Sequence, residues 1–174
     1  SSQLLVFSVT SLQSNLLSPR NPRAIYSHED TYVGYVPGGR FEIASFDPEL
    51  GAIFYIFQIP RGGEAPALDR SNRCFNCHAG SFSRRVPGLF VESVIPGDNG
   101  GPLEAFRREE GGHGMPFAER YGGWHVTTKL DFPTKANTLG NYYQGKMTLR
   151  PNPTGANFDL DRYLVSTSDI VSHL

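Results

Sequence analysis

The chain has 174 residues, a formal net charge of -1 and 39% hydrophobic residues. This length suits one domain with its own core and is short for two. The near-zero charge gives no field that would attract nucleic acid or an anionic membrane, and no apolar run is long enough for a membrane-spanning helix. Its 19 glycines and 13 prolines indicate many turns and long loops instead of a helical bundle.

The first 30 residues combine two kinds of signal. Residues 1–18 mix Leu, Val and Ser without a clear period, so they fit either one face of a helix or an edge strand. The segment 18–23 contains two prolines and is expected to be extended or to turn. It leaves Arg20 and Arg23 as exposed cations, which are candidate partners for a carboxylate.

The next part of the chain predicts three antiparallel strands. Residues 31–36, 40–46 and 52–59 are rich in aromatic and β-branched residues or alternate apolar with polar ones. Turn sequences with glycine and proline separate the three runs. Strands joined in this way form a meander.

Six further elements complete the prediction. In chain order they are a helical turn at 67–73, a strand at 87–95, a short helix from Pro102 to Gly111, a strand-like run around His125, a brief strand at 146–149, and a closing helix from Asp159 or Asp161 to Leu174. The predicted class is α+β, with an antiparallel β-meander core, short helices and long Gly/Pro-rich loops in a single domain. Because the closing helix has no C-cap glycine or proline, we expect the chain to be a fragment or processed part of a longer protein.

Residues 74–78 read Cys74-Phe75-Asn76-Cys77-His78, the C-x-x-C-H attachment pattern of a c-type haem. Two thiols add across the vinyl groups on one edge of the porphyrin, and the next side chain reaches the iron. Cys74 and Cys77 are therefore the predicted covalent anchors of one haem c, and His78 is the predicted proximal ligand. The two cysteines of the chain both lie in this motif.

Three other interpretations of the cysteine pair are less consistent with the sequence. A thioredoxin-like dithiol requires a strand before the motif within a βαβ unit, whereas Arg70-Ser71-Asn72-Arg73 is polar. A zinc site needs two more ligands, and His113 and His125 lie too far downstream for the usual spacing. A disulfide between cysteines three residues apart closes almost no loop.

A haem iron bound to His78 has one more axial position, and three candidates for it lie close together in the sequence. His113 and Met115 occupy a glycine-flanked loop, and His125 lies in the strand-like run. His113 is the first choice, and Met115 and His125 are the alternatives. A second histidine would make the iron low-spin and closed to substrate.

Several stretches together resemble a group of exported bacterial proteins with one c-type haem domain. They are residues 18–26, residues 32–39, the C-x-x-C-H motif and the Pro116-Phe117-Ala118-Glu119-Arg120-Tyr121-Gly122-Gly123-Trp124 segment. The resemblance covers most of residues 15–172. No reaction is established for the group. It implies haem and export, and it matches a histidine of the group to His113. Where the group usually has tyrosine, this chain has His125.

The sequence thus predicts a c-type cytochrome domain that transfers single electrons between exported redox partner proteins. Haem attachment takes place outside the bacterial inner membrane, so we expect a periplasmic or secreted protein whose export signal has been removed. Arg20 and Arg23 are candidate contacts of the haem propionates. A PAS-like sensor of NO, CO or O₂ is the alternative. A peroxidase-like enzyme is the third possibility, with His113 or Glu119 as its acid or base.

Overall fold

A computed structural model describes the greater part of the chain. The described residues are 2–58, 62, 64–65, 67–81, 84–89, 93–106, 115–125, 133, 135–152 and 163. His113 lies outside them, and so does the predicted closing helix except for Tyr163. In the described residues, no helix is long and apolar enough to cross a membrane.

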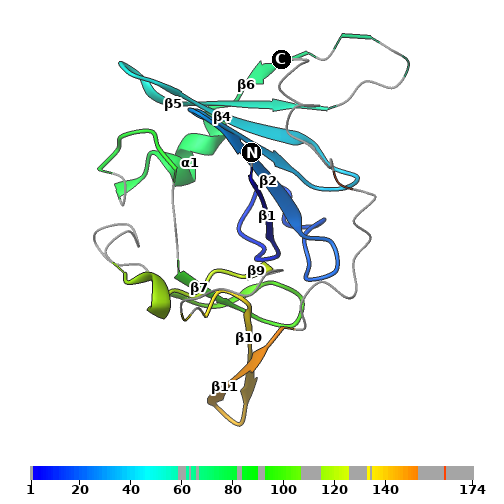
Figure 1. The fold of residues 1–174 in the computed structure, drawn as a ribbon, viewed down its shortest axis with the longest axis vertical. Coiled ribbons are helices and arrows are strands. Elements are labelled where there is room, and N and C mark those ends of the chain that lie inside the picture. The colour runs from blue at the N-terminus through cyan, green and yellow to red at the C-terminus, as the bar shows by residue number, and fades with distance from the viewer. Residues whose placement is uncertain are drawn as a thin grey trace.

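A seven-stranded antiparallel sheet forms the main body of the described structure (Figure 1). Its strands, in spatial order, are β6 (Asp69–Arg70), β5 (Gly51–Phe57), β4 (Phe41–Asp47), β3 (Thr31–Tyr35), β2 (Arg23–His28), β1 (Ser2–Val6) and β9 (Trp124–His125). From β1 to β6 the neighbours in space are also neighbours in sequence. The sheet is therefore an up-and-down meander to which β9 adds a short edge.

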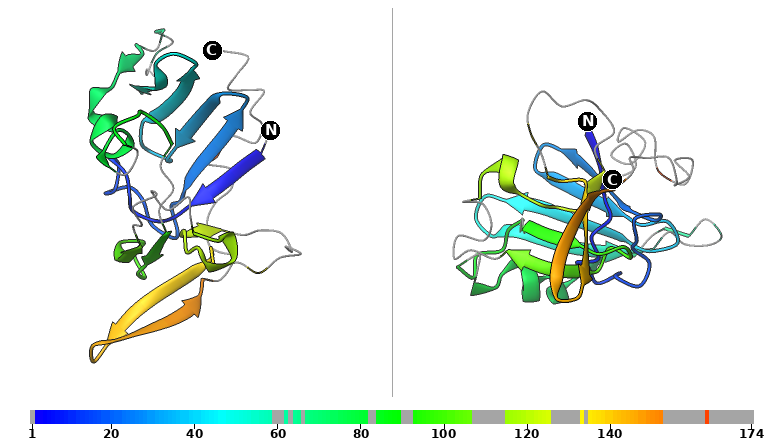
Figure 2. Two further views of the ribbon diagram at one scale, coloured as in Figure 1. Left: turned by 90° about the vertical axis from the view of Figure 1, so that its left-hand side faces the viewer. Right: turned by 90° about the horizontal axis from the view of Figure 1, so that it is seen from below.

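In the part of the chain that the structure describes, the other elements are two separate hairpins and three short helices. They are 3-10 helix η1 (Asn72–Cys74), helix α1 (Phe75–His78), hairpin β7 (Ser93–Pro96) with β8 (Pro102–Phe106), 3-10 helix η3 (Phe117–Glu119), and hairpin β10 (Thr138–Tyr143) with β11 (Lys146–Pro151). The β10–β11 hairpin projects from the end of the molecule opposite the main sheet (Figure 2). Backbone hydrogen bonds from Phe7 to Gly123 and from Val9 to Gly100 join the two ends.

The prediction of a meander of three strands at 31–36, 40–46 and 52–59 is confirmed by β3, β4 and β5. The turn between β4 and β5 is fixed by Asp47, whose Oδ1 accepts hydrogen bonds from the backbone N–H groups of Glu49 and Leu50, each at 2.9 Å. The structure is mostly antiparallel β-sheet with short helices, and it is not the helical cytochrome c fold.

The short helix predicted from Pro102 is wrong, because residues 102–106 form strand β8. Gly97 accepts a hydrogen bond from Gly100 and donates one to Gly101 at 2.7 Å, which closes a turn and brings this segment beside β7. The ladder with β7 satisfies the backbone groups that a helix would have satisfied internally. Leu103 in this strand is 37% exposed.

Other boundaries also differ from the prediction. Strand β1 lies between β2 and β9, so it is neither a helix nor an edge. Strands β2 and β10 were not predicted, and the brief strand at 146–149 extends to 151. Residues 67–73 contain β6 and the start of η1 instead of one helical turn, and the strand predicted at 87–95 is described as a strand only over Ser93–Pro96.

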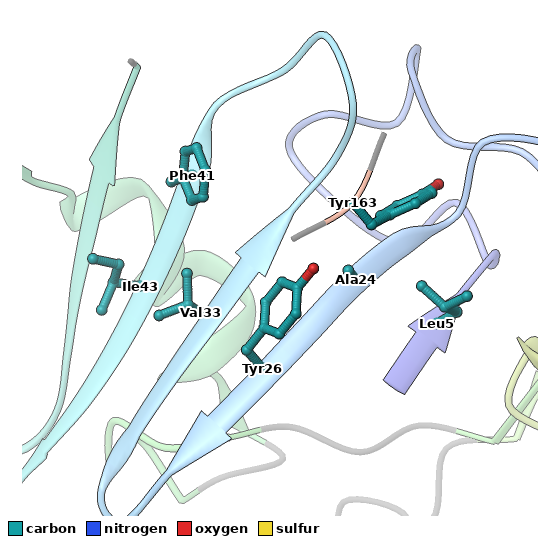
Figure 3. Packing of buried hydrophobic residues seen from close by; sticks show 7 residues of the cluster. All are labelled: Leu5, Ala24, Tyr26, Val33, Phe41, Ile43 and Tyr163. Carbon is teal, nitrogen blue, oxygen red and sulfur yellow. The ribbon is translucent and has the colours of Figure 1, made fainter. Parts of the chain in front are cut away.

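Alternation along the strands gives the main sheet two different faces. The first face carries a core cluster of Leu5, Ala24, Tyr26, Val33, Phe41, Ile43 and Tyr163 (Figure 3). Phe41 stacks on Tyr35 and on Phe57, with ring centroids 4.6 and 4.8 Å apart. Tyr163 also donates a hydrogen bond of 2.7 Å to the carbonyl of Pro22. The second face carries the cysteine motif.

Candidate cofactor-attachment site

Small side chains on the second face of the sheet leave space for the cysteine motif. Ala44 in β4 and Ala52 in β5 are 8% and 1% exposed, and they form a cluster with the neighbouring Phe54. Cys74 and Phe75 pack against this cluster. The ring of Phe75 meets Phe54 edge-on, with centroids 5.9 Å apart and an interplanar angle of 79°. Phe75, a residue of the motif, thus fixes the motif to β5 through an aromatic contact.

The backbone of η1 and α1 brings the three predicted site residues together. Residues 72–78 are continuously helical, so Cys74, Cys77 and His78 stand at positions i, i+3 and i+4 and share one side of the helix. Cys74 is partly buried and Cys77 is exposed, and both are free thiols. The structure therefore does not contain the disulfide that the sequence left as an alternative.

His78 is held in a defined tautomer by the loop that follows α1. Its Nδ1 lies 2.9 Å from the carbonyl oxygen of Gly88. Because a carbonyl only accepts hydrogen bonds, Nδ1 carries a proton, and in the neutral imidazole the lone pair therefore lies on Nε2. The backbone N–H of Gly88 donates back to the carbonyl of His78 at 3.0 Å. The imidazole lies against the ring of Phe54, with centroids 4.7 Å apart.

Strand β5 holds this loop in place at Gly51. The N–H of Ala52 donates to the carbonyl of Pro87 at 3.0 Å. Gly51 has a φ of 75°, and a Cβ at this position would lie 2.8 Å from the same carbonyl oxygen. Only glycine fits without moving the loop. The loop at 84–89 was not part of the predicted site, and no sequence signal places its carbonyl on His78.

The two thiols occupy different environments. Burial raises the pKa of the Cys74 thiol, and a hydrogen bond with Ser71 opposes this effect. The backbone N–H of Ser71 donates to the carbonyl of Phe54 at 2.8 Å, which ties the start of η1 to β5. A raised pKa is the opposite of what the attacking cysteine of a dithiol oxidoreductase needs. In addition, β6 before the motif is antiparallel to β5, so these elements do not form a βαβ unit.

The two arginines proposed as propionate contacts differ in exposure. Arg20 is exposed, as expected. Arg23 is not the exposed cation that was predicted: its side chain is 17% exposed, and its Nη2 lies 3.4 Å from Oε2 of Glu42. Burial lowers the pKa of Arg23, and the charge of Glu42 opposes that shift. The correction follows from β2, whose alternation turns Arg23 towards Glu42 in β4.

The candidates for the second axial position are described to different extents. His113 lies outside the described residues. Met115 is 8% exposed, and its carbonyl accepts a hydrogen bond of 2.9 Å from Arg120. His125 is in β9 opposite Leu5 of β1, but its side chain is not among those that the structure describes. Glu119, in η3, is exposed. The structure therefore brings Cys74, Cys77 and His78 together, but it does not identify a second axial ligand.

A polar groove of about 430 Å³ lies beside the motif on the second face. The groove is lined by Leu12, Gln13, Asn15, Leu16, Gly38, Gly39, Arg40, Glu42, Ile56, Gln58 and Arg73. Cys77 and His78 are absent from this lining. Its mainly polar walls do not suit the apolar face of a porphyrin.

Two observations show that the motif residues suit a covalently attached haem. Neither thiol is part of a disulfide, and both lie on the same side of a helix as the imidazole. The imidazole has its lone pair on Nε2, which is the nitrogen that faces away from Gly88. In the described part of the chain, no three His, Cys, Asp or Glu side chains converge as a metal site. A haem takes its equatorial ligands from the porphyrin and needs no such cluster.

Comparison with known proteins gives no family assignment. No protein-family model, curated protein or solved structure matches the chain. The interpretation of the site therefore depends on its own residues and geometry.

Proposed function

We propose that this chain is a c-type cytochrome domain that carries one covalently attached haem c and transfers single electrons between exported redox partners. Cys74 and Cys77 would form the thioethers, and His78 would be the proximal ligand. The single observation that carries the proposal is the 2.9 Å hydrogen bond from Nδ1 of His78 to Gly88. It orients the imidazole for coordination through Nε2, as metal-bound histidines require.

Each residue of the site has a distinct part in this function. When bound, the haem supplies a one-electron ferric/ferrous couple. The carbonyl of Gly88 accepts the hydrogen bond from Nδ1 of His78 and so fixes the orientation of the ring. Phe54 packs against that ring. The two thioethers would keep the group on the chain through repeated encounters with partners.

His113 remains the proposed second axial ligand, with Met115 and His125 as alternatives. A histidine there would give a closed, low-spin iron of lower potential than a His/Met centre. Arg20 and Arg23 remain proposed propionate contacts, and for Arg23 that contact would compete with Glu42. Because thioether formation takes place outside the bacterial inner membrane, the proposal includes export to the periplasm or beyond.

A haem-based sensor is the second candidate function. An antiparallel meander with the motif packed on one face is compatible with a PAS-like sensory domain. In that case the sixth position would be open or displaceable and would bind NO, CO or O₂. A peroxidase-like reaction also requires an open iron, together with a distal acid or base.

The test is an absorption spectrum of ferric and ferrous protein, produced with a haem c maturation system, before and after addition of CO. We expect a six-coordinate low-spin spectrum that CO does not change. The haem should remain on the chain in denaturing electrophoresis, and the Cys74→Ser/Cys77→Ser variant should lose it. Absence of covalent haem in the parent protein would overturn the proposal, and rapid CO binding would favour the sensor.

Histidine variants separate the axial assignments. His113→Ala should convert the iron to high-spin, whereas His28→Ala serves as the matched control because His28 is exposed in β2. An unchanged spectrum in His113→Ala would contradict the assignment to His113 and direct attention to Met115 and His125. A sulfur-to-iron charge-transfer band in the near infrared would identify Met115.

A further inference from the structure

The polar groove beside the motif has a wall that is held in place by hydrogen bonds. Gln13 lies in the turn that forms this wall, and it uses its whole side-chain amide to join the turn to the start of β4. Its Nε2 donates to the carbonyl of Arg40 at 3.0 Å and to Oε1 of Glu42 at 3.1 Å, and its Oε1 accepts from the backbone N–H of Arg40 at 2.6 Å. A Cβ on Gly39 would meet Oε1 of Gln13 and would lie 3.0 Å from Cδ1 of Leu16. The groove of about 430 Å³ is therefore preformed, and its volume is that of a site for a small molecule.

Glu42 contributes little free negative charge to this groove. Its Oε2 lies 3.4 Å from Nη2 of the mostly buried Arg23, and its Oε1 accepts the hydrogen bond from Gln13. Both oxygens thus have partners, and the charge of Arg23 offsets that of the carboxylate. Asp69 in β6 stands opposite Ile56, but it is not among the residues that line the groove.

Two guanidinium groups in the lining are free to bind a ligand. Arg40 directly precedes β4, and Arg73 lies in η1, next to Cys74. Both arginines are exposed, and among the described residues neither side chain forms an ion pair or a hydrogen bond. Because the charge of Glu42 is already offset, the two arginines give the groove a positive potential, which attracts an anion. A guanidinium group also matches the two oxygens of a carboxylate.

The rest of the lining combines apolar side chains with amides. Leu12, Leu16 and Ile56 supply the apolar part, and Asn15 and Gln58 supply exposed amides. A carboxylate carried on a short aliphatic body has groups for both kinds of surface. Inorganic phosphate would use the arginines but has no apolar part to contact the three aliphatic side chains.

We propose that the polar groove binds a small organic dicarboxylate with a short aliphatic body. One carboxylate would pair with Arg40 and the other with Arg73, and the aliphatic body would lie against Ile56 in β5. This ligand is separate from the haem and goes beyond the proposed function. Since Arg73 directly precedes Cys74, the ligand would lie beside the cysteine motif.

The experiment titrates the full chain with glutarate in isothermal titration calorimetry at low ionic strength. Glutaramide, which has the same length but no charge, and inorganic phosphate are the comparison probes. We expect glutarate to bind with a dissociation constant below about 1 mM and the other two probes to bind at least about tenfold more weakly. Arg40→Gln and Arg73→Gln should each weaken the binding of glutarate about tenfold, because each removes a charge-assisted hydrogen bond. Arg20→Gln is the matched control, because Arg20 is exposed and does not line the groove.

Two further variants test the geometry of the groove. Arg73→Lys keeps the charge but loses the fork, so it should weaken binding by only about threefold. Gly39→Ala keeps every charge but displaces Gln13, so it should also weaken binding. Denaturant unfolding of each variant separates loss of the ligand from loss of the fold. Arg40→Gln and Arg73→Gln should unfold like the parent, because neither side chain has a partner among the described residues.

Three results would overturn the proposal. They are no binding of glutarate, equal affinity of the parent and both glutamine variants, and binding of phosphate or glutaramide as tightly as glutarate. Failure of the proposed function is distinct, because calorimetry does not require haem, whereas absence of covalent haem appears in the absorption spectrum.

Discussion

On one face of the main sheet, the rings of Tyr35, Phe41 and Phe57 stack across three neighbouring strands at 4.6 and 4.8 Å. On the other face of the same strands, Ala44 and Ala52 leave space for the cysteine motif. Alternation along a strand gives both patterns. Large side chains pack across one face, whereas small ones on the other face let a short helical segment approach.

The two faces also differ in polarity. The core cluster on the first face is formed by apolar and aromatic side chains. The second face includes the ion pair between Arg23 and Glu42, and Gln13 donates a 3.1 Å hydrogen bond to the same carboxylate. The comparison indicates that the first face mainly stabilises the fold and that the second holds the site. Three experiments can break or sharpen that division.

The largest effect is expected from paired phenylalanine truncations on opposite faces. Phe41→Ala and Phe54→Ala remove rings that are 4% and 5% exposed, so each should lower the free energy of unfolding by about 3–5 kcal/mol in denaturant titration. Only Phe54→Ala removes the ring that packs against His78, so only this variant should change the absorption spectrum of the folded holoprotein. An equal spectral change in Phe41→Ala would contradict the division between the faces.

An intermediate effect is expected at the ion pair. Glu42→Gln keeps an acceptor for Gln13 but leaves Arg23 buried without its counter-charge, which should cost about 2–3 kcal/mol of unfolding free energy. Adding Arg23→Met should recover most of this loss, because the buried charge is then gone. Denaturant unfolding of both single variants and the double variant measures the coupling. If the two single losses simply add, the pair is not the source of the effect.

The smallest effect is expected between the two thiols. In protein without haem, Cys74 should react with iodoacetamide about tenfold more slowly than Cys77, because burial raises its pKa and so lowers its thiolate fraction. The pH at which Cys74 reacts half-maximally should lie above that of an ordinary thiol. The variants Cys77→Ser and Cys74→Ser isolate each thiol, and the two rates should converge in denaturant. Faster reaction of Cys74 would contradict the burial seen in the structure.

Local sequence patterns predicted part of the fold well. The meander at β3–β5 followed from alternation and from turn residues such as Asp47, because those signals act within a few residues. Strand β8 was predicted as a helix because the local sequence does not show that this segment pairs with β7 across a turn. Strand β2 was missed for the same reason: its buried residues, Ala24 and Tyr26, are defined by packing on other strands.

The sequence by itself determined the chemistry available at the site: two thiols and an imidazole at the spacing of haem attachment. The tertiary structure decided what surrounds them. Gly88 reaches His78 from ten residues away, Gly51 in β5 fixes that loop, and Arg23 turns inward to Glu42. Spacing along the chain sets which groups share a helix side, whereas contacts between distant segments depend on how the strands pair and pack.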